Sequence, residues 1–356
     1  MKKIYTLAAI LFFNSIVSNA QAIDVIDPID RGATGFELSG NDLYYASADN
    51  GTIAKIDITA VSPVIIDVIT GLDEPEGILL IGNDLYIAQA GANKISKIDI
   101  TAGTPTIIDV VTGLNEPTYL AVSGNDLYIS EMGASKISKV DITASTPTST
   151  TDVITGITTP LGLAMSGNNL YIVQPELNKI SKIDITDNTP TTTDVVTGLS
   201  KPLLISLQGN DLYIAESDGK KISKIDITAS TPTTATDVIT ELGSAGSLVS
   251  NETAVYFSDS SSNDIDSKIS KINFASLSLD DHLNSKETYI YPNPTNDFIL
   301  VSELSKNENY TIYNTSGNEV LNGTISEKGI IDVRTLTNGI YFFKINNSTP
   351  KKFIKN

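Results

Sequence analysis

Internal repetition is the feature of this sequence that most constrains its fold. A G-N-D-L-Y unit recurs every 42 or 43 residues, with its tyrosine at Tyr44, Tyr86, Tyr128, Tyr171, Tyr213 and, in a degenerate copy, Tyr256. Motifs of the form K-I-S-K-I-D and T-G-L-x-x-P keep the same period. Periods of about 40–45 residues with four short apolar segments each are typical of propeller blades. We therefore predict an all-β chain with a six-bladed β-propeller over residues 23–274.

The unit over residues 113–154 shows how one blade is built. It offers strands at 119–122, 127–130 and 136–142, and a fourth at 151–155 just beyond. Gly124 and Asn125 tolerate the positive φ that a tight hairpin needs between the first two strands. The last unit lacks a fourth strand, but the segment I-D-V-I at 23–26 matches the fourth strand at 66–69. We therefore expect the N-terminal strand to complete the last blade and to close the ring.

The N-terminus has the pattern of a secretory signal peptide over residues 1–22. Lys2 and Lys3 precede an apolar stretch at 4–13, and small residues follow at Ser18, Ala20 and Ala22. The stretch is too short to span a bilayer, and no later segment reaches that length. We expect cleavage after Ala20 or Ala22 and no transmembrane segment in the mature chain.

A polar linker at 275–286 ends the periodic region, and residues 287–356 differ in composition. About seven short, aromatic-rich strands separated by Gly/Asn turns predict a small Ig-like β-sandwich. Four motifs occur in order in this tail. Their landmark residues are Tyr291, Pro292, Asn293 and Pro294, then Gly317, then Gly339 and Tyr341, and finally Lys351 and Lys352.

These four motifs resemble the type A C-terminal sorting domain of the type IX secretion system of Bacteroidetes. The resemblance implies that the type IX machinery is a partner of residues 287–356. It also implies export across the inner membrane by the signal peptide, then across the outer membrane by recognition of the tail. The expected location is extracellular or on the outer cell surface, reached through the periplasm.

Composition excludes several function classes. The chain has 24 Lys and Arg against 42 Asp and Glu, and residues 23–285 carry a net charge of −21. This charge argues against nucleic acid as a partner, because phosphate binding needs a basic surface. There is no Cys, and His282 in the linker is the one histidine. Thiolate nucleophiles, Cys/His zinc sites and catalytic arrangements with two histidines are therefore excluded.

Comparison of the repeats indicates which face of the ring is specific. The loops between first and second strands, and between third and fourth strands, lie on one face and are nearly interchangeable. The loops on the opposite face, which we call the loop face, diverge between copies and carry Glu76 and Glu116. The residues that follow the loop-face proline or its equivalent form a first ring of Thr34, Glu76, Thr118, Leu161, Leu203 and Ala245. Divergence here favours a binding face, and drift in solvated loops is the alternative.

The repeats also resemble six-bladed propellers of the NHL, SMP-30/gluconolactonase and TolB-like kind, through P-L-G-L-A at 160–164 and G-N-D-L-Y-I-S-E at 124–131. These propellers include enzymes and binding modules. The ends of the second strands form a second ring of Ser47, Gln89, Glu131, Gln174, Glu216 and Asp259. Glu131, Glu216 and Asp259 could bind Ca²⁺ for a hydrolase or lactonase at the channel mouth, or they could accept hydrogen bonds from their own loops. The loop at 259–267 adds Asp264 and Asp266 but lacks the calcium-loop pattern.

The preferred hypothesis is a monomeric, non-catalytic binding or scaffolding module without a cofactor, whose loop face contacts a glycan, a peptide or a surface protein. The alternative is a Ca²⁺-dependent hydrolase or lactonase. The lone histidine and missing Cys favour the binder, and the sequence leaves enzymatic activity open. The Lys and Asp of K-I-S-K-I-D are interpreted as structural charge pairs stacked from blade to blade.

Overall fold

The computed structural model describes residues 21–30, 32–260, 266–274, 290–291, 295–301, 308–315, 317–325, 329–345 and 351–356. The chain divides into two compact units, Met1–Leu277 and Ser278–Asn356. Most of the expected signal peptide lies outside the described residues, as does all of the linker, including His282. The one helical element with both ends among the described residues is a 3-10 turn, η1 (Pro175–Leu177). No described helix is long and apolar enough to cross a membrane.

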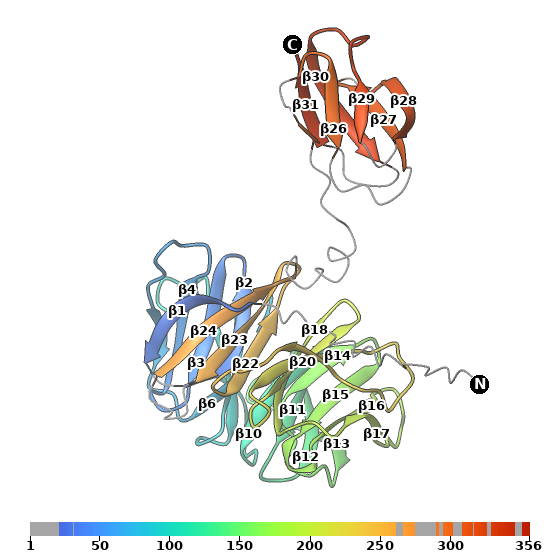
Figure 1. Cartoon of the computed structure of the whole chain (residues 1–356). Helices are drawn as coiled ribbons and strands as arrows, with labels where there is room; N and C mark the ends of the chain where they lie inside the picture. The colour runs from blue at the N-terminus through green and yellow to red at the C-terminus, as the bar shows by residue number, and fades with distance from the viewer. Residues whose placement is uncertain are drawn as a thin grey trace, which may run out of the picture. The chain divides into compact units, whose positions relative to one another are not determined.

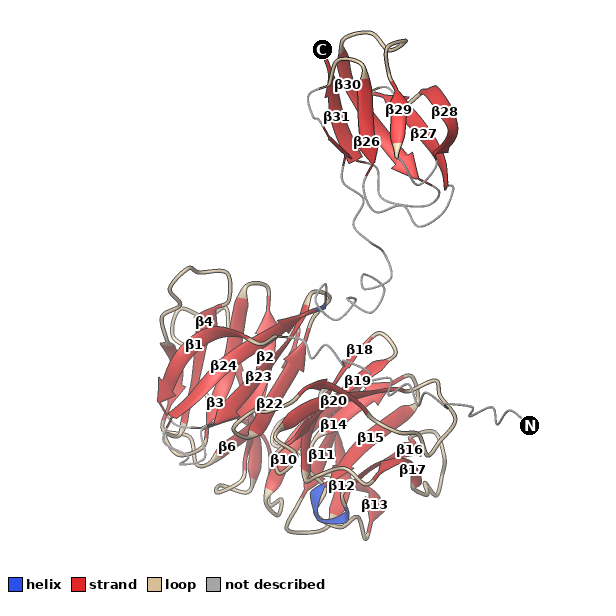
Figure 2. Ribbon diagram, viewed as in Figure 1, coloured by secondary structure: helices blue, strands red, loops and turns tan. Residues whose placement is uncertain are grey.

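Repeated four-stranded antiparallel sheets make up the first unit (Figures 1 and 2). Five are formed by consecutive strands. The first sheet consists of β2 (Ala33–Ser39), β3 (Asp42–Ser47), β4 (Thr52–Asp57) and β5 (Ile66–Thr70). The second consists of β6 (Pro75–Ile81), β7 (Asp84–Gln89), β8 (Lys94–Asp99) and β9 (Ile108–Thr112), and the third of β10 (Pro117–Ser123), β11 (Asp126–Glu131), β12 (Lys136–Asp141) and β13 (Thr151–Thr155). The fourth consists of β14 (Leu163–Ser166), β15 (Asn169–Gln174), β16 (Lys179–Asp184) and β17 (Thr193–Thr197), and the fifth of β18 (Pro202–Gln208), β19 (Asp211–Glu216), β20 (Lys221–Asp226) and β21 (Thr236–Ile239).

The last sheet of this unit combines both ends of the repeat region. Its order is β1 (Ile23–Asp30), β24 (Asp266–Asn273), β23 (Ala254–Ser260) and β22 (Ala245–Ser250). In Figure 1 the blue N-terminal strand lies beside the orange β24, and Ile23 pairs with Lys271. The N-terminal strand thus takes the outer position that the repeat alignment predicts for it.

The first strands of successive sheets contact one another in sequence order, from β2 through β6, β10, β14 and β18 to β22, and β22 contacts β2. Hydrophobic clusters fill the spaces between adjacent sheets. In one cluster, Tyr44 and Ile53 of one sheet pack with Leu85 and Ile87 of the next. Because the second strand of a sheet is covered on both faces, both its inward and outward residues are apolar, as in Leu85–Ala88 of β7.

Lysines of the K-I-S-K-I-D motif form cross-strand ion pairs within their own sheets. Lys139 lies 2.7 Å from Asp126 of the neighbouring strand, and Lys136 lies 2.6 Å from Asp152 of the outer strand. The closing Asp141 accepts hydrogen bonds from the backbone N–H and the hydroxyl of Thr143 at the following turn. The interpretation as structural charge pairs is therefore confirmed, but stacking from blade to blade is wrong, because the pairs form within one sheet. Each lysine reaches diagonally to an aspartate of an adjacent strand, since Lys139 is directly opposite Tyr128 and Asp152 is directly opposite Ser138.

The second unit has two sheets. One has the order β25 (Ile290–Tyr291), β26 (Phe298–Val301) and β29 (Ile330–Asp332), and the other β28 (Glu319–Ile325), β27 (Glu308–Asn314), β30 (Gly339–Ile345) and β31 (Lys351–Lys355). Residues from both sheets, including Ile299, Ile312, Phe343 and Phe353, share one core. This unit therefore has a hydrophobic core of its own.

Candidate functional site: the channel and the loop face

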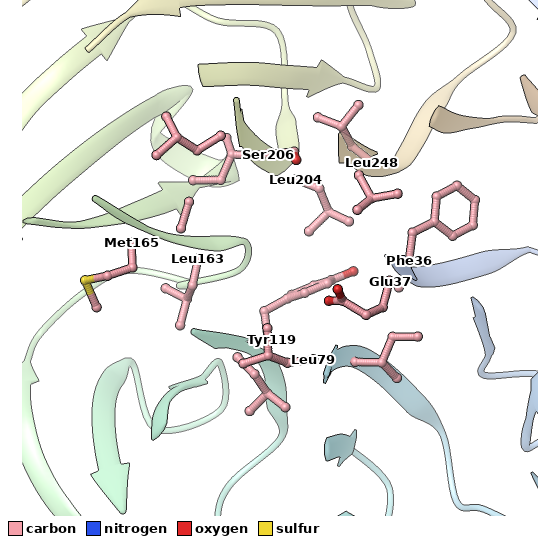
Figure 3. Close-up of a pocket in the computed structure, with 16 residues that line it drawn as sticks. Phe36, Glu37, Leu79, Tyr119, Leu163, Met165, Leu204, Ser206 and Leu248 are labelled. Carbon is pink, nitrogen blue, oxygen red and sulfur yellow. The ribbon is translucent and has the colours of Figure 1, made fainter. Parts of the chain in front are cut away.

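A channel runs between the first strands of the sheets in the first unit. It contains a cavity of about 220 Å³ to which all of these strands, β2, β6, β10, β14, β18 and β22, contribute residues (Figure 3). Strand pairing defines equivalent positions around the channel: Glu37, Leu79, Ala121, Ala164, Ser206 and Val249 each lie opposite the tyrosine of their own repeat.

Two residues earlier in each strand the channel is constricted. Tyr119 of β10 occupies this level, and its hydroxyl donates a short hydrogen bond to the carbonyl oxygen of Thr34 on β2. Between them, at the equivalent position of β6, lies Gly77, where a Cβ atom would meet the Tyr119 ring at 2.7 Å and the Thr118 carbonyl oxygen at 2.5 Å. The absence of a side chain at Gly77 is therefore what lets Tyr119 reach across the channel. Burial, and secondarily the Glu76 carboxylate, raise the pKa of Tyr119 well above its usual value.

The cavity lies on the hairpin-turn side of this constriction. Its walls are mainly aliphatic, and Glu37 is the one carboxylate among the residues that line it. Figure 3 shows Glu37 and Tyr119 both directed toward the centre of the cavity. Burial raises the pKa of Glu37 to about 7, and hydrogen bonds from the backbone N–H groups of Leu38 and Leu80 oppose the shift.

Glu76 lies on the other side of the constriction, next to the loop face. It is half-buried, and burial followed by the carboxylates of Glu74 and Asp49 raises its pKa to about 7. The first ring predicted from the sequence needs one correction. Ala245 pairs with Asp259 as Pro75 pairs with Gln89, so Ala245 occupies the proline position and not the position after it.

The three carboxylates of the second ring accept hydrogen bonds within their own repeats. Glu131 is 2% exposed; its carboxylate accepts a hydrogen bond from the backbone N–H of Asn115 at 3.0 Å and another from the hydroxyl of Ser138 at 2.6 Å. Glu216 makes the same two contacts with Ser200 and Ser223. These carboxylates therefore join the loop before their sheet to its third strand.

Asp259 and Gln89 repeat the contact to the preceding loop. The Asp259 carboxylate accepts a hydrogen bond from the backbone N–H of Gly243 at 2.7 Å. The side-chain oxygen of Gln89 accepts one from the backbone N–H of Asp73 at 3.1 Å. The equivalence of an amide and a carboxylate at this position shows that the contact does not depend on a negative charge. Glu131, Glu216 and Asp259 are not gathered into one cluster: across the described ranges, no three His, Cys, Asp or Glu side chains form a group that could hold a metal ion. Asp264 lies outside the described residues.

The loop face repeats one backbone conformation with different side chains. The residue before each loop-face proline has a positive φ although it is not glycine, at Glu74 (46°), Glu116 (48°), Thr159 (40°) and Lys201 (51°). The backbone N–H groups of Glu116 and Lys201 donate to the side-chain oxygens of Asn93 and Asn178, at 2.8 and 2.9 Å. These two asparagines lie in the connections between the second and third strands of the preceding repeats. Glu74, Glu116 and Lys201 are exposed, so this fixed backbone presents variable side chains to solvent.

Sequence reasoning missed Glu37 and Tyr119. Both depart from the repeat: Glu37 replaces residues that are mostly apolar in the other copies, and Tyr119 replaces Gly35, Gly77 or Gly162. Comparison of the copies inside the strands, as well as in the loops, would have found them.

The tail motifs have different surroundings. Tyr341 is buried, stacks on Phe353 at 5.6 Å and donates a hydrogen bond to the carbonyl oxygen of Thr337 at 2.8 Å. Gly317 closes a turn with φ of 79°, and Gly339 begins β30. Lys351 and Lys352 are exposed on β31. Tyr291 ends β25, and Pro292, Asn293 and Pro294 lie outside the described residues.

Residues 289–356 match the family described as secretion system C-terminal sorting domain. This domain implies handling by the type IX secretion system and export to the cell surface or the extracellular space. Comparison with curated proteins gives no match.

Solved structures similar to this chain are β-propellers. A streptogramin B lyase has a TM-score of 0.54 at 16% identity, covering 72% of this chain and 98% of its own. A virginiamycin B lyase from Staphylococcus aureus has a TM-score of 0.51 at 14% identity, covering 71% and 98%. A luciferin-regenerating enzyme has a TM-score of 0.58 at 11% identity, covering 71% and 95%. At these identities the similarity shows the fold alone. The chain thus combines a β-propeller with a C-terminal sorting domain.

Proposed function

We propose that this chain is a secreted or cell-surface, six-bladed β-propeller that binds a glycan, peptide or protein partner through its loop face. The proposed organisation is a signal peptide at 1–22, the propeller at 23–274, a linker at 275–286 and an Ig-like, type A sorting domain at 287–356. The sorting domain supports the export route, because it is the part that type IX machinery recognises.

The observation that carries the binding role is the loop face itself. Its backbone recurs from sheet to sheet and is held by hydrogen bonds, while the exposed residues at its positive-φ positions differ, as at Glu74, Glu116 and Lys201. Residues held in sparsely populated backbone conformations cluster at functional sites. A rigid scaffold that presents variable side chains is suited to recognition, as in other loop-based binding surfaces.

Contacts at the second ring weigh against the hydrolase alternative. That alternative depends on the carboxylates of Glu131, Glu216 and Asp259. Each of them accepts a hydrogen bond from a backbone N–H of the loop before its sheet. A lyase mechanism like that of the similar structures is also disfavoured. A further solved structure of this fold, with a TM-score of 0.53, is a virginiamycin B lyase from Staphylococcus aureus made catalytically inactive by replacing a histidine with alanine. Residues 21–274 of this chain contain no histidine.

The binding role is tested with the mature propeller as bait for extracellular glycans and outer-surface proteins. Glu74→Lys and Glu116→Lys together should abolish retention of the partner, because they reverse charge on the loop face. The matched control is the double variant Asp187→Lys, Glu252→Lys on the opposite face, where both residues are exposed. Asp187 lies in the connection between β16 and β17, and Glu252 lies in the hairpin turn between β22 and β23. Equal loss of retention in both double variants would refute recognition through the loop face.

The export route is tested by deleting residues 287–356 in the cell. The truncated chain should accumulate in the periplasm, and a passenger protein fused to these residues should reach the surface or the medium. Normal delivery of the truncated chain would contradict the assignment.

A further inference from the structure

The channel cavity is a one-ended pocket, separate from the loop face. At the constriction, Gly35, Gly77 and Gly162 are buried, and Tyr119 spans the channel to Thr34. Exposure increases along the strands toward the hairpin turns: Ile205 and Leu248 are buried, whereas Leu207 and Val249 are only half-buried. A ligand would therefore enter from the hairpin-turn side and stop at the Tyr119 ring.

The pocket walls define the chemistry of that ligand. Leu79, Leu163, Met165 and Leu207 contribute aliphatic surface. Small-molecule sites are typically apolar, with a few polar groups that orient the ligand. Two other polar groups in the wall are already hydrogen-bonded: the Tyr119 hydroxyl donates to Thr34, and the Ser206 hydroxyl shares a hydrogen bond with Ser250 at 2.7 Å. The Glu37 carboxylate is the charged group that remains to orient a ligand.

Glu37 differs from the half-buried aspartates that begin the second strands. Asp42 and Asp84 lie 2.7 Å from Lys55 and Lys97, respectively. Glu37 forms no salt bridge among the described residues, and its hydrogen bonds come from backbone N–H groups. An uncompensated carboxylate in an apolar pocket is costly unless a cation accompanies it. The face of Tyr119 adds an attraction for a cation, since aromatic rings carry negative charge on their faces.

We propose that this pocket binds a small organic cation, an ammonium group on a compact apolar body, with the ammonium at Glu37 and the apolar body against the aliphatic wall. A cavity of about 150 Å³ accommodates benzene, so a pocket of about 220 Å³ has room for roughly nine non-hydrogen atoms. This proposal does not depend on recognition through the loop face, because the two sites lie on opposite sides of the constriction.

The titratable groups around Glu37 are few, so the pH dependence of cation binding should report the charge of Glu37 itself. Tyr119 faces it from β10 and Tyr44 pairs with it from β3, while Lys55 on β4 is paired with Asp42. The cavity-lining residues of β6 and β22, such as Leu79 and Val249, carry no charge, and Glu76 lies beyond the constriction. Because a bound ammonium stabilises the carboxylate, affinity should rise about tenfold per pH unit below pH 7 and level off above it.

The experiment is calorimetric titration of the full mature chain with cyclohexylammonium at pH 8, with neutral cyclohexanol as the comparison ligand. We expect saturable binding of the cation and at least about tenfold weaker binding of the alcohol, since a hydrogen bond to a charged group is worth roughly 1.5–3 kcal/mol. Glu37→Gln should weaken cation binding by the same factor and remove its pH dependence.

Two further variants keep the test decisive. Val249→Phe, which fills the pocket near its opening, should block binding of the cation. Glu252→Gln removes an exposed negative charge from a hairpin turn on the same face and should leave the affinity within about twofold, because surface charges are screened. Equal affinity for the alcohol, retention of binding in Glu37→Gln, or no saturable binding at millimolar cation would each overturn the proposal. Undiminished partner capture by the loop-face variants, with cation binding intact, would instead refute only the loop-face function.

Discussion

The carboxylate of Asp24 lies 2.9 Å from the ammonium group of Lys268, and the hydroxyl of Ser270 donates to the same carboxylate at 2.9 Å. Asp24 belongs to β1 and Lys268 to β24, so these contacts join the two ends of the repeat region. The same ion pair recurs between the third and fourth strands of other sheets, for example Lys94 with Asp109 at 2.8 Å. The N-terminal strand therefore reproduces the contacts of an ordinary outer strand.

Deleting residues 23–27 should strongly destabilise the propeller. The deletion leaves β24 with an unpaired edge and removes Val25 and Ile26 from the cluster around Phe36 and Tyr45. We expect a loss on the order of 3–5 kcal/mol and a fall in Tm of about 10 °C, measured by calorimetry. A truncated chain that melts like the parent would contradict closure by β1.

Asp24→Asn measures the contribution of the ion pair to stability separately from that of strand pairing. The hydrogen bond from Lys268 lowers the pKa of Asp24, so the pair contributes above the unfolded pKa, about pH 4, and its contribution is lost as pH falls through the folded value. The cost at pH 7 should be below about 1 kcal/mol, because both side chains are partly exposed. A cost as large as that of the deletion would show that the charge, and not strand pairing, holds the ring closed.

The effect of a substitution at Glu131 on stability should depend on whether the new side chain accepts hydrogen bonds, and not on its charge. Glu131→Gln should change the free energy of unfolding by less than about 1 kcal/mol, because Gln89 accepts the equivalent backbone N–H in its own sheet. Glu131→Ala should cost roughly 2–3 kcal/mol, since the Asn115 N–H and the Ser138 hydroxyl lose their acceptor. Urea unfolding compares the two variants, and a Gln variant as unstable as the Ala variant would contradict the structural role.

Gly77→Ala tests the constriction of the channel. The new methyl group would approach the Thr118 carbonyl oxygen to 2.5 Å and the Tyr119 ring to 2.7 Å, so the backbone must shift. We expect destabilisation of about 2–3 kcal/mol, read from the thermal midpoint. The control is Gly103→Ala, where nothing lies within 4 Å of the added atom, and it should leave the midpoint nearly unchanged. Similar midpoints for both variants would place the Tyr119 side chain elsewhere.

Stability should fall as pH rises from 5 to 8. The pKa values of Glu37 and Glu76 are raised from 4.5 to about 7, chiefly by burial, so the folded protein binds protons that the unfolded chain releases. Their contribution is complete below the unfolded value and lost as pH rises through about 7. Aspartates with lowered pKa values, such as Asp141, act in the opposite direction only near pH 4 and below. Thermal melts across this range provide the measurement.

Glu37→Gln and Glu76→Gln together should remove this slope and raise the Tm at pH 8 above that of the parent. Glu252→Gln, at an exposed position, should keep the slope of the parent. A Tm that stays constant or rises between pH 5 and 8 in the parent would show that neither carboxylate is buried as described.

The repeated sheets could be predicted from the sequence, because the period of Tyr44, Tyr86 and Tyr128 and the hairpin residues beside them are local signals. The sorting domain could also be predicted, since its motifs lie close together in the chain. Matching the segment at 23–26 to the outer strand at 66–69 was enough to place the N-terminal strand in the last sheet.

The contacts of individual side chains depend on the folded ring and could not be predicted from the sequence. From the sequence, the Glu131 carboxylate could face either the channel or its own sheet. In the structure it faces its own sheet, because the loop before that sheet folds back and brings the backbone N–H of Asn115 to the carboxylate. Glu37 and Tyr119 come from different sheets and share a cavity because the ring brings their strands together around one axis. Repetition fixes the backbone of each blade. What the channel can bind is decided by the positions where one copy departs from the others, since those side chains meet only when the ring is closed.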